Sequence, residues 1–145
     1  MPIRVARTEW SGGLQDGSGK TELVSSGLGS YEVSFPKRSA EEAGGATSPE
    51  ELIAAAHSAC YAMQLSAFLA DAGGPPDRLE VTAEVSLGPD PAGGFRIPGI
   101  SLKVRAEVPG VDAQAFAKAS EAAKAGCPVS KALAGTTISL DAALV

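Results

Sequence analysis

The chain has 145 residues, which is the size of one ordinary domain. Hydrophobic residues make up 44% of it and charged residues 20%, so a packed core is expected and wholesale disorder is excluded. The 12 Lys and Arg against 17 Asp and Glu give a net charge of -5, and the absence of a basic stripe argues against a nucleic-acid partner. We expect a single domain over residues 1–145, with no internal repeat and no linker.

The N-terminal strands come first in the chain. The sequence starts with Met1-Pro-Ile-Arg, without an apolar leader, so we expect a cytoplasmic protein and not a secreted one. Alternating and β-prone residues predict three short strands at 3–10, 20–25 and 30–35, separated by glycine-containing turns. Residues 41–47 are expected to form a flexible connector.

A long helix follows the connector. Ser48 is the predicted N-cap, Pro49 suits the first helical position, and Glu51 completes a capping box. The helix should run for about 24 residues, or about 36 Å, until Gly73-Gly74-Pro75-Pro76 ends it. It is apolar on almost every face, so we expect other elements to surround it.

This helix is also long enough to be considered as a membrane span. Its centre carries His57, Ser58, Gln64 and Ser66, and much of the rest is Ala, which gains little free energy from transfer into lipid. We therefore expect a buried helix of a soluble protein and no membrane partner.

The second half of the chain alternates strands and helices. Apolar residues at every second position predict half-buried strands at 79–87 and 100–108, with a hairpin loop at 89–94. Asp112 should cap a helix that runs to about residue 125, and Cys127-Pro128 should start a short helix that runs to about residue 134. A last strand is expected at 138–144. Strands grouped in hairpins predict an α+β fold, not a doubly wound one.

The two cysteines are the main candidates for chemistry. They lie far apart in the sequence, which is not a zinc-binding pattern, so they are either inert core residues or redox-active thiols. Cys127 is expected at a helix N-terminus, where the free N–H groups favour a thiolate. Cys60 lies in mid-helix, where apolar burial should raise its pKa. If Cys60 is reactive it needs a cation from elsewhere, and Arg38 and Lys37 are the candidates.

His57 lies three residues before Cys60, so the two side chains share a helix face. A Cys–His hydrolase pair is therefore one alternative, although no oxyanion hole is evident. The other is a histidine that hydrogen-bonds to a neighbouring strand or a partner chain. Glu50 and Glu51 are most simply first-turn residues that complement the helix dipole.

Two segments carry a family resemblance. Thr47-Ser-Pro-Glu-Glu-Leu-Ile-Ala-Ala-Ala-His-Ser-Ala-Cys60 and Ala125-Gly-Cys-Pro-Val-Ser-Lys131 resemble the osmotically inducible protein C (OsmC) family, which belongs with the organic hydroperoxide resistance (Ohr) proteins. His57 before Ser-Ala-Cys is closer to the OsmC branch. The resemblance covers essentially the whole chain. It implies antiparallel sheets wrapped around a long central helix, an intertwined homodimer, and no metal, haem or flavin cofactor.

The same resemblance implies a thiol peroxidase for organic hydroperoxides, with hydrogen peroxide as a poorer substrate. Cys60 would be the peroxidatic cysteine that becomes a sulfenic acid, and Cys127 the resolving cysteine that forms a disulfide with it. Glu50 would hold the activating Arg38, with Lys37 as the alternative because the connector is about two residues longer than the family pattern. An external dithiol, from a lipoyl protein or a thioredoxin-type partner, or a small thiol, would reduce the disulfide. In the family, Cys60 would attack the peroxide first. The local sequence instead predicts that Cys127 is the more acidic thiol.

Two further expectations bear on how the site is assembled and used. Glu50 and Cys60 lie about 15 Å apart along one straight helix, so a second copy of the chain is expected to supply Arg38 and Glu50. The main alternative to the enzyme is a non-catalytic binding or structural protein of the same fold, in which the cysteines merely pack.

Overall fold

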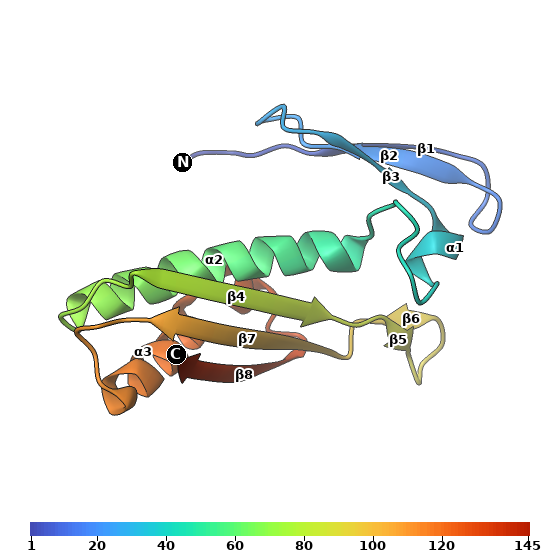
Figure 1. Cartoon of the computed structure of the whole chain (residues 1–145). Helices are drawn as coiled ribbons and strands as arrows, with labels where there is room; N and C mark the ends of the chain where they lie inside the picture. The colour runs from blue at the N-terminus through green and yellow to red at the C-terminus, as the bar shows by residue number, and fades with distance from the viewer. The chain divides into compact units, whose positions relative to one another are not determined.

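The computed structural model describes residues 1–145, and the chain divides into two compact units, Met1–Leu52 and Ile53–Val145. Figure 1 gives the order of the elements along the chain. A single family domain over residues 1–145 stays a prediction.

The first unit holds an antiparallel sheet. Strands β1 (Arg7–Ser11), β2 (Ser18–Glu22) and β3 (Ser30–Val33) are ordered β1-β2-β3, as Figure 1 shows in blue. The three strands predicted in this region are confirmed, although the first begins later than the alternation suggested. A short helix, α1 (Phe35–Arg38), follows directly.

Helix α1 corrects the expectation that the strand starting at residue 30 continues to residue 35. The Ser34 hydroxyl accepts a hydrogen bond from the Lys37 backbone N–H at 3.4 Å, and a proline stands in the first turn. Proline is favoured there because the first N–H groups of a helix have no intrahelical acceptor. Arg38 therefore projects from the end of a helical turn.

Helix α2 (Pro49–Asp71) confirms the predicted long helix and its N-cap. The Ser48 hydroxyl accepts from the Glu51 backbone N–H at 3.2 Å, but the Glu51 carboxylate accepts from the Thr47 hydroxyl at 2.6 Å. Only half of the predicted capping box is thus formed. The helix ends where expected, because Gly73 adopts a positive φ of 102° that most other residues avoid.

The second unit contains a mixed sheet in the order β4-β7-β8. Strand β4 (Arg78–Val85) pairs antiparallel with β7 (Gly99–Glu107), and the small hairpin β5 (Gly88–Pro89) and β6 (Phe95–Arg96) connects them. Strand β8 (Thr137–Leu144) pairs parallel with β7.

The expected antiparallel pairing is found in every strand pair except β7–β8, which is parallel. Between β7 and β8 the chain passes through helices α3 (Ala113–Gly126) and α4 (Pro128–Ala132). Such a crossover returns the chain to the same end of the sheet, so the next strand runs in the same direction. The predicted α+β class is confirmed, as is Asp112 as the N-cap of α3, where its carboxylate accepts from the Ala115 N–H at 2.8 Å.

The core of the second unit lies between the sheet and two helices. Alternate residues of β4, β7 and β8 form an apolar face, and α2 and α3 pack against it (Figure 1). The fully buried members include Leu65 and Leu69 of α2 and Leu102 of β7. Burying one such side chain stabilises the fold by about 1.5–3 kcal/mol.

Only one stripe of α2 is covered. His57, Tyr61, Leu65 and Leu69 recur every fourth residue and are fully buried, whereas Met63 is 70% exposed. Within one chain, other elements therefore cover one face of α2, and the expectation that they surround the helix is met on that face alone. By length and composition α2 is also apolar enough to cross a membrane, a test that core helices of soluble proteins pass as well.

Candidate active site

The structure brings the two cysteines together within the second unit. Cys60 lies on α2, Cys127 immediately precedes α4, and their sulfurs are 2.9 Å apart. Both are free thiols. A disulfide bond is about 2.05 Å long, so the sulfurs are close enough to share a proton and need only a small movement to form a bond.

Cys127 is held by both helices that it joins. Its backbone N–H donates to the Ala123 carbonyl at 2.9 Å, which ends α3, and its own carbonyl accepts from the Lys131 N–H at 3.0 Å, which begins α4. Pro128 fixes the first turn of α4. The sulfur is fully buried and directed toward Cys60.

Cys60 is the more accessible thiol. It borders an open hollow of about 460 Å³, which is lined mainly by apolar residues of α2 and by Pro128. The α2 residues include Ala56, Ala59 and Met63. An apolar molecule can therefore reach the Cys60 sulfur while Cys127 stays covered.

The two thiols ionise differently. Burial raises the pKa of Cys60, and the neighbouring Cys127 sulfur raises it further. Burial also opposes ionisation of Cys127, but Cys60, Ser130 and the Val129 N–H together lower the pKa of Cys127. The neighbouring groups therefore make Cys127 the more acidic of the two thiols, which is the order of pKa values that the local sequence predicted. Cys60 still needs a cation if it is to react first.

His57 has a buried partner that the sequence did not identify. Its Nε2 lies 2.7 Å from the Ser130 hydroxyl oxygen of α4, and burial lowers the pKa of His57. The expected partner, a strand or another chain, is wrong for this ring nitrogen. No hydrogen bond joins His57 to Cys60, which removes support from a Cys–His hydrolase. The sequence feature that could have indicated this contact is the spacing of the two residues from the cysteines. Ser130 lies three residues after Cys127, and His57 lies three residues before Cys60.

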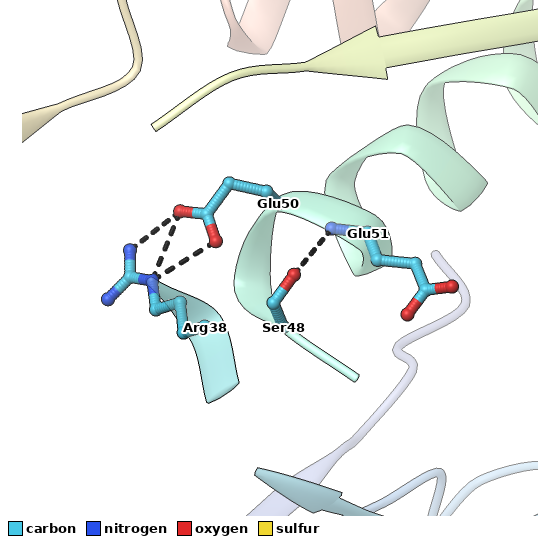
Figure 2. A network of polar contacts seen from close by, with 4 residues as sticks. All are labelled: Arg38, Ser48, Glu50 and Glu51. Atoms are coloured by element: carbon cyan, nitrogen blue, oxygen red, sulfur yellow. Dashed lines mark hydrogen bonds and ion pairs between the residues drawn. The ribbon is translucent and has the colours of Figure 1, made fainter. Parts of the chain in front are cut away.

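Arg38 and Glu50 form a second cluster, which lies within the first unit (Figure 2). Arg38 Nη2 donates to Glu50 Oε1 at 2.7 Å, and Arg38 Nε lies 3.2 and 3.1 Å from Oε1 and Oε2. Burial works to raise the pKa of Glu50, but the Arg38 hydrogen bonds help to hold it below its usual range. The same pairing raises the pKa of Arg38. This is the bidentate carboxylate–guanidinium pair that the family resemblance implied.

Lys37 is engaged elsewhere. Its Nζ donates to the Gly44 carbonyl in the connector at 3.1 Å. Arg38 also borders a largely apolar pocket of about 320 Å³, whose lining includes Trp10, Leu14 and Phe35. Arg38 thus pairs with Glu50 beside this pocket, whereas Lys37 is held by the connector.

Within residues 1–145, no group of three or more His, Cys, Asp or Glu side chains could hold a metal ion. The reactive groups that the structure presents are two adjacent thiols and a guanidinium held by a carboxylate. Adjacent free thiols are typical of thiol-dependent redox proteins.

The chain belongs to the OsmC-like protein family, whose model matches residues 42–141. It is 43% identical over 127 residues to the protein named peroxiredoxin OsmC of Escherichia coli, a match that covers 88% of this chain and 87% of that protein. It is 33% identical over 104 residues to the organic hydroperoxide resistance protein of Xanthomonas axonopodis pv. citri, covering 71% and 70%.

A solved structure shares the fold. The crystal structure described as an organic hydroperoxide resistance protein OsmC from Legionella pneumophila superposes with a TM-score of 0.75 at 26% identity, over 99% of this chain and 98% of that one. The OsmC resemblance inferred from the two cysteine motifs is confirmed, and with it the class of peroxiredoxin-like enzymes.

Proposed function

We propose that this protein is a cytoplasmic thiol peroxidase that reduces organic hydroperoxides, and hydrogen peroxide less well. The observation that carries the proposal is the pair of free sulfurs 2.9 Å apart, one of them bordering an apolar hollow. The names of the Escherichia coli and Xanthomonas relatives support the same substrate class.

In the first step the Cys60 thiolate attacks the distal oxygen of the hydroperoxide. A sulfur–oxygen bond forms as the O–O bond breaks, and the leaving alkoxide takes a proton and departs as an alcohol. Cys60 is oxidised to a sulfenic acid. Because burial and Cys127 raise the pKa of Cys60, this step requires a cation near its sulfur.

Arg38 is our candidate for that cation. Its guanidinium, held by Glu50, would stabilise the thiolate and orient the peroxide. Helix α2 is continuous from Glu50 to Cys60, which places them about 15 Å apart along its axis. We therefore propose a homodimer in which a second copy supplies Arg38 and Glu50 to each thiol pair.

In the second step the Cys127 thiolate attacks the sulfenic sulfur of Cys60. The disulfide forms as the sulfur–oxygen bond breaks, and the hydroxide that leaves takes the proton that Cys127 released, giving water. An external dithiol, from a lipoyl protein or a thioredoxin-type partner, would then return both cysteines to thiols.

Stoichiometric oxidation tests the proposal. One equivalent of cumene hydroperoxide should remove both free thiols and lower the mass of the chain by two hydrogen atoms. Cys60→Ser should abolish this reaction, whereas Cys127→Ser should stop at the sulfenic acid of Cys60. Turnover with cumene hydroperoxide should exceed that with hydrogen peroxide when several dithiols are compared. Thiols that survive excess peroxide would favour the non-catalytic alternative, in which the cysteines merely pack.

A further inference from the structure

The buried contact between His57 and Ser130 has no role in the steps above. His57 is 0% exposed, and its Nε2 lies 2.7 Å from the Ser130 hydroxyl oxygen. Its other ring nitrogen, Nδ1, is buried and has no hydrogen-bond partner. Polar atoms buried in this way are uncommon, so the arrangement calls for a physical account.

The bare Nδ1 determines which nitrogen carries the proton. Burial lowers the pKa of His57, so the ring is neutral and bears one N–H. A buried N–H without an acceptor is rarer than an unused lone pair, so the hydrogen belongs on Nε2. In this tautomer His57 donates to the Ser130 oxygen, and the proton of the Ser130 hydroxyl is free to point elsewhere.

The Cys127 sulfur, at the N-cap of α4, is the candidate acceptor. Ser130 lies three residues after Cys127, in the first turn of the helix whose N-cap is Cys127. The Ser130 hydroxyl and backbone N–H are among the groups that lower the pKa of Cys127. Cys60 also acts on this sulfur, whereas burial raises the pKa of nearby Tyr61 to about 12 and keeps it neutral.

We propose that His57 and Ser130 are positioning residues for Cys127. His57 donates Nε2–H to Ser130, which turns the Ser130 hydroxyl proton toward the Cys127 sulfur and holds that sulfur as the nucleophile facing Cys60. The inference rests on the proposed function only in that Cys127 is the thiol that attacks the oxidised Cys60. Neither side chain touches the peroxide, and neither changes its covalent state.

The tautomer can be measured directly, because His57 is the sole histidine of the chain. Nitrogen-15 NMR of the reduced protein at neutral pH should show one neutral imidazole with its proton on Nε2. A proton on Nδ1 would overturn the proposal, because Nε2 would then accept a hydrogen bond from the Ser130 hydroxyl. A charged ring would also overturn it, because Nδ1 would then be a buried donor without an acceptor.

The effect on Cys127 is tested without any peroxide. In a Cys60→Ser background Cys127 is the only thiol, and its alkylation by iodoacetamide is followed against pH. Ser130→Ala and His57→Leu should raise the Cys127 pKa and slow alkylation below it by about tenfold, because a hydrogen bond to the thiolate is lost. Ser130→Thr and His57→Gln keep the donors and should restore the parent profile.

Ser139→Ala is the matched control, because Ser139 lies on β8 and its hydroxyl donates to the Ile100 carbonyl. Unchanged alkylation profiles in both Ser130→Ala and His57→Leu would refute the proposal. Circular dichroism identifies a variant that fails to fold. In that case Ser130→Thr and His57→Gln still test the proposal, because it requires their alkylation profiles to match that of the parent.

A single-turnover experiment separates this inference from the proposed function. With both cysteines present, Ser130→Ala should leave sulfenic acid formation at Cys60 unchanged and slow disulfide closure by about tenfold. Closure at the parent rate would contradict the positioning role. If the parent forms neither a sulfenic acid nor a disulfide with any hydroperoxide, the peroxidase proposal fails, and the alkylation and NMR results still test the role of the His57–Ser130 contact.

Discussion

At the residue scale, Arg38 has one observed partner, Glu50, and one proposed partner, the Cys60 thiolate. It neutralises Glu50 within the first unit, and under the proposed mechanism its guanidinium also activates Cys60. A guanidinium that binds a carboxylate through Nε and Nη2 keeps a further nitrogen, Nη1, with hydrogens to donate. Such a group can hold a carboxylate and a peroxide or thiolate at the same time.

Arg38→Ala should raise the Cys60 pKa and slow peroxide reduction by at least about tenfold, because the stabilising charge is removed from the thiolate. The thiolate absorbance of Cys60, titrated in a Cys127→Ser background, measures the shift. Lys37→Ala is the control, since Lys37 is engaged with the Gly44 carbonyl and should leave both quantities unchanged. Equal Cys60 pKa values with and without Arg38 would exclude it from the mechanism.

The Glu50 carboxylate should make stability depend on pH in the acid range. Its folded-state pKa lies below its usual range, so the pair with Arg38 stabilises the fold above the pKa of the unfolded chain. That contribution is lost as the pH falls through the lowered folded-state value. Glu50→Gln should cost about 1.5–3 kcal/mol at neutral pH and progressively less in acid. Urea unfolding of both proteins from pH 7 to pH 2.5 measures the difference, and a constant difference would contradict the linkage.

At the scale of elements, the stripe of α2 that faces the sheet should carry most of the helix's stabilising contacts. Leu65→Ala removes a fully buried side chain, leaves a cavity, and should cost about 2–5 kcal/mol of unfolding free energy. Val145→Ala is the control, since that side chain is 70% exposed and should change stability by less than about 0.5 kcal/mol. Chemical denaturation measures both, and similar losses would mean that α2 is not anchored by this stripe.

The elements that could be predicted from the sequence are those with local signals. Ser48 and Gly73 mark the two ends of α2, and Asp112 marks the start of α3, because each acts on the backbone within a few residues. The parallel pairing of β8 and the contact of His57 with Ser130 have no local signal, since they depend on how the chain returns after the α3–α4 crossover. The meeting of Cys60 with Cys127 followed from the family resemblance and not from periodicity.

At the scale of the whole molecule, the uncovered side of α2 is the main reason to expect a second chain. Ala56, Ala59, Met63 and Ala67 form an apolar stripe that borders the hollow at Cys60. Exposed apolar stripes of this kind are typical of surfaces that meet another protein. A second copy that brings its own Arg38 to this stripe would cover it and supply the cation that the proposed mechanism requires at Cys60.

Mixing two inactive variants tests the shared site. Cys60→Ser removes the nucleophile from one chain, and Arg38→Ala removes the cation from the other. If each site combines the thiols of one chain with Arg38 of its partner, one site of the heterodimer carries both lesions and the other carries neither. Refolded mixtures should then recover up to about a quarter of the wild-type activity per chain, because random pairing makes half of the dimers mixed and each mixed dimer has one intact site. If each site is built within one chain, every site retains a lesion and mixing restores nothing, and a fully active monomer would also exclude the shared site.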